Sequence, residues 1–413
     1  MKVLICGAGR VGHGIARRLA RERHDITMID ENADLVEQVS TDLDVRGVCG
    51  HAAHPDVLRK AGAEDCEMII AVTYYDEINM VICQIAHTLF SVPYKIARVR
   101  DQSYIDPAWK NIFSREGLPI DMVISPEIEV GEAILQRFRT PGAVMSASFG
   151  QGQVKLLGLE VEDDSPLLDT PLDQLKGLFP ELSARVVGIG RAERIFAPRS
   201  NDVLSPGDQA YIAVLDEHAE RLTTIFNRES TGVKQVIIVG GGNVGLYVAK
   251  TLEKESAIRI RLIESDEGRA DVAVSELHRS IVLHGDGLNA NILEEAGAAS
   301  ADFVIVITND DKTNMLISNL AKRAGAKRTL ALINSTELAP LARDMKIDAV
   351  LDPRALTVSQ ILLHMRRGRI LGLQSIGDGS AEVAEGITLA SSSLIGKSLG
   401  YDDLPEGVVA AAV

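Results

Sequence analysis

The sequence has few aromatic residues, few cysteines and no long apolar run. Aromatic residues make up 4% of the 413 residues, and tryptophan occurs once. Apolar runs such as Met68–Thr73 and Phe303–Thr308 are strand-sized, far short of the roughly 18 residues of a membrane-spanning helix. No CxxC pair occurs, so we expect a reducing, cytosolic compartment in which all four cysteines are buried apolar residues: Cys6, Cys49, Cys66 and Cys83. The glycine loop begins as early as residue 7, so we expect no signal peptide.

An excess of positive charge is also missing. Lys and Arg number 43 against 58 Asp and Glu, which gives a formal net charge of −15 and a pI near 5.1. A nucleic-acid surface needs clustered Lys and Arg, so we expect no nucleic-acid partner. The 46% of apolar and 24% of charged residues are typical of a soluble globular chain, and the length fits two to four domains.

An internal duplication organises the chain. Gly7–Gly12 (GAGRVG) recurs as Gly240–Gly245 (GGGNVG), and Ile29-Asp30 recurs as Ile263-Glu264. Without a gap, 48–80 then matches 283–315, with identities that include AGA at 61–63 and 296–298, and Asn-Met at 79–80 and 314–315. Glycines alone could coincide by chance, but the other identities in register indicate a duplicated unit.

Short apolar runs alternate with helical patterns in each copy, which is typical of a parallel sheet. The expected fold is α/β, with two tandem Rossmann-like doubly wound parallel-sheet domains, each followed by a small α+β module. The first copy has expected strands at 3–6, 26–29, 45–49, 68–73 and 95–99. The expected domains are 1–140, 141–230, 231–368 and 369–413, with a linker near Thr231-Gly232 and an incomplete last module.

The first α+β module has its own expected elements. Strands are predicted at 154–159, 185–189 and 209–214, and a short helix capped by Thr170 and begun by Pro171 is predicted through Leu175. Crossing helices are predicted over 126–138 and 353–365. The apolar spacing leaves open whether each covers its own sheet or a neighbouring one.

The glycine loops indicate dinucleotide binding, because each follows a strand, opens a helix and precedes a carboxylate by 18 or 19 residues. The helix N-terminus offers N–H groups to phosphates, and Asp30 or Glu264 can accept from ribose hydroxyls. These carboxylates would repel a 2′-phosphate, which favours NAD-type or adenosine nucleotides. The alternative is a Rossmann unit that has lost its ligand. The loop candidates are Gly7, Ala8, Gly9, Arg10, Val11 and Gly12 in copy one, and Gly240, Gly241, Gly242, Asn243, Val244 and Gly245 in copy two.

Other candidates lie at further strand ends. Thr73 and Thr308 end the fourth strands, where they could bind ligand or cap the next helix; Tyr74 and Asn309 follow them. His51 and Asp286 occupy one aligned position after the third strand, where an adenine or ribose contact competes with an ordinary loop role. A metal site is not expected.

On the fifth strand, Arg98 and Arg100 could reach phosphates or form surface salt bridges, whereas copy two has Leu332 and Asn334 at these positions.

Three segments carry a resemblance to a known family: the first loop with Asp30, residues 73–80 (TYYDEINM) and residues 96–100 (IARVR). On these, the chain resembles the cytosolic regulators of potassium conductance, which include regulatory subunits of bacterial Trk potassium uptake. The resemblance implies a non-enzymatic protein that binds NAD(H) or adenine nucleotides. It also implies ring assembly under a membrane potassium channel or transporter, and hence a peripheral location at the inner face of the membrane.

The function expected from these features is nucleotide-dependent regulation of potassium uptake. The alternative is an NAD-dependent oxidoreductase, but the α+β modules are small for enclosing a substrate and the only histidine in 151–230 is His218. A DNA-binding redox sensor would need a basic recognition helix. We expect a tetramer, with ADP or ATP at the first site and NAD or NADH at the second.

Overall fold

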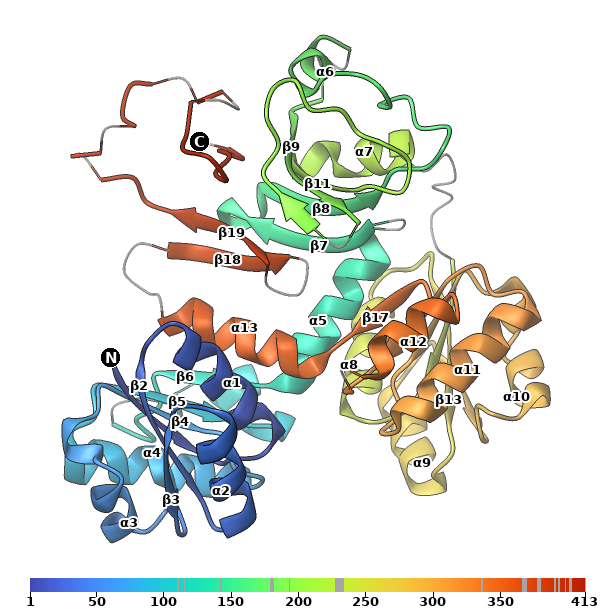
Figure 1. The fold of residues 1–413 in the computed structure, drawn as a ribbon. Coiled ribbons are helices and arrows are strands. Elements are labelled where there is room, and N and C mark those ends of the chain that lie inside the picture. The colour runs from blue at the N-terminus through green and yellow to red at the C-terminus, as the bar shows by residue number, and fades with distance from the viewer. Residues whose placement is uncertain are drawn as a thin grey trace. The chain divides into compact units, whose positions relative to one another are not determined.

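The computed structural model (Figure 1) describes most of the chain. The described residues are 1–109, 111–114, 116–140, 143–178, 182–192, 194–226, 234–335, 337–365, 370–376, 380–389, 391–392, 394–397, 399–400 and 403–412. They divide into two compact units. Met1–Val130 with Asp352–Leu362 form the first, and Gly131–Leu351 with Leu363–Val413 form the second.

The first unit contains a six-stranded parallel sheet in the order β3-β2-β1-β4-β5-β6. Its strands are β1 (Lys2–Cys6), β2 (Asp25–Asp30), β3 (Arg46–Cys49), β4 (Met68–Ala71), β5 (Tyr94–Arg98) and β6 (Met122–Ile124). Its helices are α1 (Arg10–Arg21), α2 (Ala33–Asp42), α3 (Pro55–Lys60) and α4 (Asp76–Phe90), with short turns η1 (Ala63–Asp65), η2 (Gln102–Tyr104) and η3 (Pro107–Trp109). The change in strand order between β1 and β4 sets the carboxyl ends of both beside one crevice, where doubly wound sheets bind ligands.

The second unit repeats this sheet in the order β14-β13-β12-β15-β16-β17. The strands are β12 (Gln235–Val239), β13 (Arg259–Glu264), β14 (Ile281–His284), β15 (Phe303–Val306), β16 (Thr329–Leu332) and β17 (Ala349–Leu351). The helices are α8 (Asn243–Leu252), α9 (Glu267–Glu276), α10 (Ala290–Glu295), α11 (Asp311–Ala324) and α12 (Leu338–Asp344), with the turn η6 (Ala298–Ser300). Central strands such as β15 are buried along their whole length, as expected of a parallel sheet covered on both faces.

A smaller antiparallel sheet, ordered β10-β9-β11-β8-β7, forms the α+β module of the second unit. It consists of β7 (Ala143–Phe149), β8 (Val154–Glu160), β9 (Ala184–Arg191), β10 (Arg194–Phe196) and β11 (Gln209–Leu215), with α6 (Leu172–Leu178), α7 (Ala219–Phe226), η4 (Gly150–Gly152) and η5 (Asp216–His218). One face packs on α7 through Leu222 and Phe226. The hairpin β18 (Ile370–Ile376) and β19 (Ala381–Gly386) contacts the other face, where Ile376 packs with Leu156 and Tyr211.

Two helices carry the chain away from the parallel sheets: α5 (Pro126–Arg139) after β6 and α13 (Pro353–Met365) after β17. Most of α5 belongs to the unit of the second sheet, and most of α13 belongs to the unit of the first. Each helix therefore leaves its own sheet, which decides between the two alternatives that apolar spacing left open.

The predicted fold class is confirmed, and each expected strand of the first copy and of the first module is present. In the same parts of the chain, β6, β7 and β10 were not predicted. The predicted cap is wrong: the helix begins at Leu172, and the Thr170 hydroxyl donates to the Leu168 carbonyl oxygen at 3.2 Å. The linker predicted near Thr231-Gly232 lies outside the described residues, and the four domain boundaries stay a proposal.

The cysteine prediction holds for three of the four residues. Burial raises the pKa of the Cys66 thiol to about 11 and that of Cys83 to about 12, while Cys6 is fully buried between strands. Cys49 is exposed, because it ends the edge strand β3, which has only one neighbouring strand.

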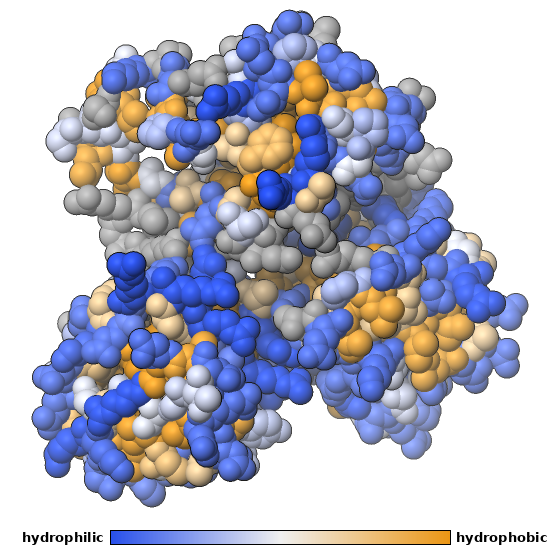
Figure 2. Space-filling model, viewed as in Figure 1, coloured by the Kyte–Doolittle hydropathy of each residue, from blue (hydrophilic) through white to orange (hydrophobic). Residues whose placement is uncertain are grey.

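Hydrophilic residues cover most of the face seen in Figure 2. Within the described residues, no helix has the length and apolar character needed to cross a bilayer.

Candidate functional site: two glycine loops at the sheet edges

Each glycine loop makes a tight turn that only glycine accommodates. Gly7 has φ of 111° and Gly240 has φ of 115°, in the left-handed region that other residues rarely adopt. A Cβ atom on Gly12 would overlap the carbonyl oxygen of Gly7, and one on Gly245 would overlap that of Gly240. The outer glycines therefore hold strand and helix in close contact in both copies.

The middle glycines leave room for a ligand. Gly9 and Gly242 are the N-cap residues of α1 and α8, and neither helix receives a side-chain cap. A Cβ atom added to either glycine would have nothing within 4 Å. The first N–H groups of each helix thus border open space, and the helix dipole favours an anion there. This geometry fits a pyrophosphate, with Arg10 and Val11 or Asn243 and Val244 following in the first helical turn.

A carboxylate at the end of the second strand braces each loop. Asp30 accepts from the Ala8 N–H at 2.7 Å and from the Asn32 N–H at 2.9 Å. Glu264 accepts from the Gly241 N–H at 2.6 Å and from the Asp266 N–H at 2.8 Å. Each carboxylate oxygen can accept more than one hydrogen bond, so these contacts leave capacity for ribose hydroxyls.

The two threonines lie at the expected edge but do not cap helices. Tyr75 and Asp310 are the N-cap residues of α4 and α11, so the capping alternative is wrong. Instead, Thr73 Oγ1 donates to Oδ1 of the fully buried Asn79 at 2.7 Å. Thr308 and Asn314 repeat this bond at 2.6 Å.

Both buried asparagines connect a helix to two strand ends. Asn79 also accepts from the Thr73 N–H and donates to the carbonyl oxygens of Thr73 and Arg98. Asn314 makes the same four contacts with Thr308 and Leu332. Asp76 and Asp311 accept from backbone N–H groups that follow the fifth strands. In the sequence these four residues stand out as identities between the two repeats, and Asp76 and Asn79 also lie in the segment 73–80 that carries the family resemblance, but no structural role was predicted for them.

The arginines of the first copy differ in their partners. Arg100 Nε binds the buried carboxylate of Glu127 at 2.9 Å, which raises the pKa of Arg100. Arg98 Nη2 donates to the Thr73 carbonyl oxygen at 2.7 Å, and its buried Nε has no hydrogen-bond partner within the described chain. Burial and the neighbouring Arg100 guanidinium lower the pKa of Arg98. The salt-bridge alternative therefore describes Arg100 but not Arg98.

The corresponding strand end of the second copy is uncharged. Leu332 stands in place of Arg98, and Asn334 replaces Arg100. Asn334 Nδ2 and N–H both donate to Oδ1 of Asp311 at 2.9 Å. This edge thus offers a ligand polar groups that are already engaged and no guanidinium from the fifth strand.

The remaining candidates have local roles. His51 Nδ1 accepts from the Ala53 N–H at 3.2 Å and its ring stacks on His54, while Asp286 accepts from the Leu288 N–H at 2.9 Å. Tyr74 is 72% exposed beside the first site, and Asn309 is exposed beside the second. Among the described side chains, no group of three or more His, Cys, Asp or Glu is placed to hold a metal ion.

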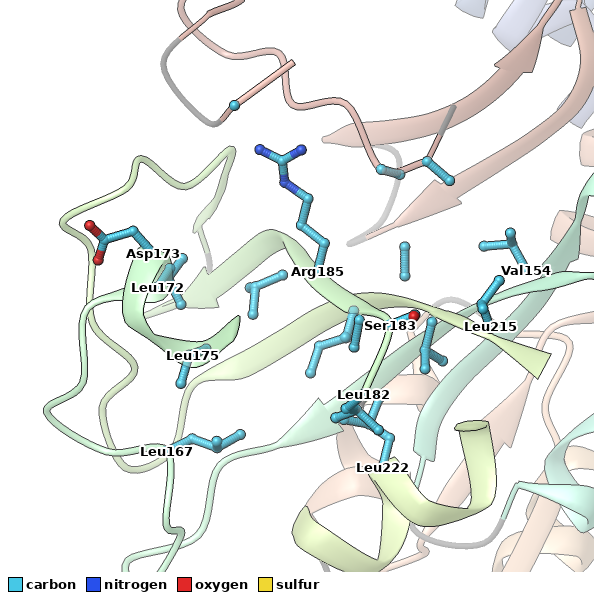
Figure 3. A pocket seen from close by; sticks show the side chains of 18 of the residues that line it. Val154, Leu167, Leu172, Asp173, Leu175, Leu182, Ser183, Arg185, Leu215 and Leu222 are labelled. Carbon is cyan, nitrogen blue, oxygen red and sulfur yellow. The ribbon is translucent and has the colours of Figure 1, made fainter. Parts of the chain in front are cut away.

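A separate hollow of about 810 Å³ lies in the α+β module (Figure 3). Leucines such as Leu172 and Leu222 line it, and Arg185 projects toward the C-terminal segment, where Nη1 donates to the Leu399 carbonyl oxygen at 2.8 Å. Neither glycine loop contributes to its lining. The hollow is therefore distinct from the two sheet-edge sites.

Comparison with known proteins agrees with this duplicated geometry. Residues 3–126 and 236–353 match the TrkA-N domain, and residues 156–227 match the TrkA-C domain. The Trk system potassium uptake protein TrkA of Azorhizobium caulinodans is 49% identical over 414 residues, covering 100% of this chain and 90% of that protein. The chain belongs to the TrkA family. The TrkA protein of Halomonas elongata is 38% identical with the same coverage.

Solved structures share the fold of this TrkA-family chain. The GsuK RCK domain superposes with a TM-score of 0.65 at 19% identity, covering 89% of this chain and 77% of that one. The GsuK channel bound to NAD superposes with a TM-score of 0.64 at 19% identity, covering 87% and 62%. At these identities the likeness concerns the fold alone and carries no residue roles.

Proposed function

We propose that this TrkA-family chain is the nucleotide-binding regulatory subunit of a membrane potassium-uptake system. The observation that carries the proposal is the pair of open N-caps at Gly9 and Gly242, each beside a braced carboxylate. Both sites can hold an adenosine ribose and a pyrophosphate. The names of the relatives, Trk system potassium uptake protein TrkA, support the transport context.

Binding without chemistry suits a regulator. A nucleotide shifts an assembly between two states only by the difference in its affinity for them. The described side chains at the two sheet edges hydrogen-bond to backbone groups and hold the loops in place. No described pair of side chains there forms a nucleophile with its base. The chain would act at the inner face of the membrane through its transporter partner, as a homo-oligomer.

The two sites are proposed to prefer different ligands. Arg98 has an unpartnered buried N–H, and a guanidinium binds phosphate oxygens more strongly than a neutral donor does. Site one would therefore favour ADP or ATP, whose terminal phosphates carry more charge. Site two lacks the two arginines and would be satisfied by NAD or NADH.

Potassium flux tests the main proposal. Liposomes holding the transporter partner are assayed with and without this chain, in the presence of ATP, ADP, NAD or NADH. We expect the flux to depend on both the chain and the nucleotide. Flux that ignores every nucleotide would reject the proposal, and NADH consumption with small carbonyls would instead favour an oxidoreductase.

Calorimetry tests the difference between the sites. Arg98→Ala should weaken ADP and ATP binding by about tenfold or more, since a charge-assisted bond contributes about 1.5–3 kcal/mol. NADH binding at site two should be unchanged. Leu332→Ala, at the matched position of copy two, serves as the control, and unaltered affinity of Arg98→Ala for every nucleotide would reject the role of this arginine.

A further inference from the structure

The helices α5 and α13 are equivalent parts of the duplicated chain. Pro126 and Pro353 begin them directly after β6 and β17, which fixes an offset of 227 residues. Burial follows this offset: Ile134 and Ile361 are both fully buried. The two helices thus present corresponding positions to the surfaces on which they pack.

Each helix meets the helix that follows a glycine loop, and each meeting point contains one glycine. In the first unit, Gly14 of α1 faces Val358 of α13, and a Cβ atom on Gly14 would lie 3.3 Å from Val358 Cγ2. In the second unit, Gly131 of α5 faces Tyr247 of α8, and a Cβ atom on Gly131 would overlap Cδ1 of the tyrosine ring. Backbone and side chain are therefore in direct contact at both points.

The sizes at these two meeting points are reversed. Position 14 of α1 corresponds to position 247 of α8 at the loop offset of 233, and position 131 corresponds to position 358 at the offset of 227. The first unit thus combines a small residue on the loop helix with a large one on the crossing helix. The second unit combines a large residue on the loop helix with a small one on the crossing helix.

We infer that this reversed pair of sizes selects the partner of each crossing helix: the loop helix of the other repeat. If each crossing helix packed on a loop helix of its own repeat, Gly131 would face Gly14 and leave a void. Val358 would face Tyr247, and the two side chains would compete for one space. Voids and overpacking both destabilise a packed interface. Packing of each crossing helix on the loop helix of its own repeat is therefore disfavoured at both meeting points.

A hydrogen bond reinforces the same choice. Tyr247 Oη donates to Glu132 Oε1 at 2.5 Å, next to the glycine contact. The residue equivalent to Glu132 on α13 is Ser359, and Gly14 carries no hydroxyl. Only the α5–α8 combination pairs a hydroxyl with a carboxylate at this point, which makes the stronger, charge-assisted bond. Each crossing helix therefore fits the loop helix of the other repeat and rejects the loop helix of its own repeat, whether that loop helix lies in the same chain or in a second copy of it.

Thermal unfolding of the full chain tests the packing. Gly131→Val should lower Tm by about 5 °C, because the valine overlaps the Tyr247 ring. Adding Tyr247→Gly recreates the combination of the first unit, so the double variant should lose less than the two single variants together. Gly177→Val is the control, since nothing lies within 4 Å of a Cβ atom on this helical glycine. Strictly additive losses would overturn the inference.

Disulfide trapping tests the choice of partner directly, in a Cys49→Ser background that removes the exposed native thiol. Gly14→Cys with Val358→Cys should form a cross-link in the oxidised chain, because a Cβ atom on residue 14 would lie 3.3 Å from Cγ2 of Val358. Tyr247→Cys with Val358→Cys places both thiols on the loop helix and the crossing helix of the same repeat, and should form no cross-link. Both variants should keep the parental Tm under reducing conditions to within about 5 °C. A cross-link in the second variant, or none in the first, would overturn the inference.

Discussion

At the scale of single residues, the two glycine loops differ at two positions that contact each other: the residue after the first glycine, and the carboxylate that accepts from its N–H group. Copy one combines Asp30 with Ala8, and copy two combines the longer Glu264 with Gly241. A Cβ atom on Gly241 would lie 3.1 Å from both Cβ and Oε2 of Glu264, so an alanine here would press against the longer carboxylate, whereas glycine leaves room for it. The two loops hold their carboxylates against the same N–H group by different combinations of residues.

The middle glycines give a prediction in which folding and binding separate. Gly242 has extended backbone angles, φ −72° and ψ −173°, that any residue can adopt, and its Cβ position is open. Gly242→Val should leave Tm within about 2 °C of the parent, while NADH binding at site two falls by about tenfold or more because the side chain fills the phosphate space. Gly9→Val should affect the ligand of site one alone. Calorimetry checks both, and intact binding in both variants would contradict the assignment of the sites.

A buried carboxylate of the α+β module gives a prediction about pH. Burial by itself would raise the pKa of Asp208, but the hydrogen bonds from Arg191 and from the Ser205 N–H lower it below the ordinary value of 3.8. A lowered pKa contributes stability above that value, and the contribution disappears as the pH falls through the folded-state pKa.

Replacing this carboxylate should therefore matter at neutral pH and less in acid. Asp208→Asn should lower the free energy of unfolding at pH 7 by about 2–3 kcal/mol, since a charged hydrogen bond to Arg191 is lost. Urea denaturation at pH 7 and pH 3 measures the difference, which should shrink at the lower pH. Asp202→Asn, which removes an exposed contact to the Arg199 N–H, is the control. An equal loss at both values would contradict the linkage.

At the scale of secondary-structure elements, a buried asparagine connects one helix to two strand ends at each proposed site. Asn79 fastens α4 to the ends of β4 and β5, and Asn314 does the same for α11, β15 and β16. Asn79→Ala should lower the free energy of unfolding by about 3 kcal/mol, because several buried polar groups lose their partners. Nucleotide affinity should fall at site one only, and Asn314→Ala should show the reverse.

Denaturation and calorimetry measure the two effects of the asparagines. Asn309→Ala is a suitable control, because Asn309 is exposed at the same edge. If both alanine variants weakened both sites equally, the asparagines would be general supports of the chain and not elements of one site each.

At the scale of the whole molecule, two sheet domains per chain suit a ring built from few chains. We predict a tetramer, with a mass four times the 44.5 kDa of the chain. Light scattering at micromolar concentration checks this value, with and without ATP or NADH. A stable monomer under every condition would contradict the prediction.

The features that could be predicted from sequence depend on neighbours in sequence. The alternation of short apolar runs with helical patterns indicated the parallel sheets, because period and length reflect burial within one element. The glycine loops and the carboxylates Asp30 and Glu264 were recognisable because a turn without Cβ atoms and a fixed spacing are local requirements. The duplication was likewise visible in register along the chain.

Tertiary structure decided what depends on residues far apart. The difference between Arg98 and Arg100 depends on Glu127, some 27 residues beyond Arg100, and the exposure of Cys49 depends on the position of β3 at the sheet edge. The choice of partner for α5 and α13 depends on Gly131 meeting Tyr247 and Gly14 meeting Val358. Apolar spacing states only that a helix face will be buried, whereas the shape of the opposite surface determines which neighbour buries it.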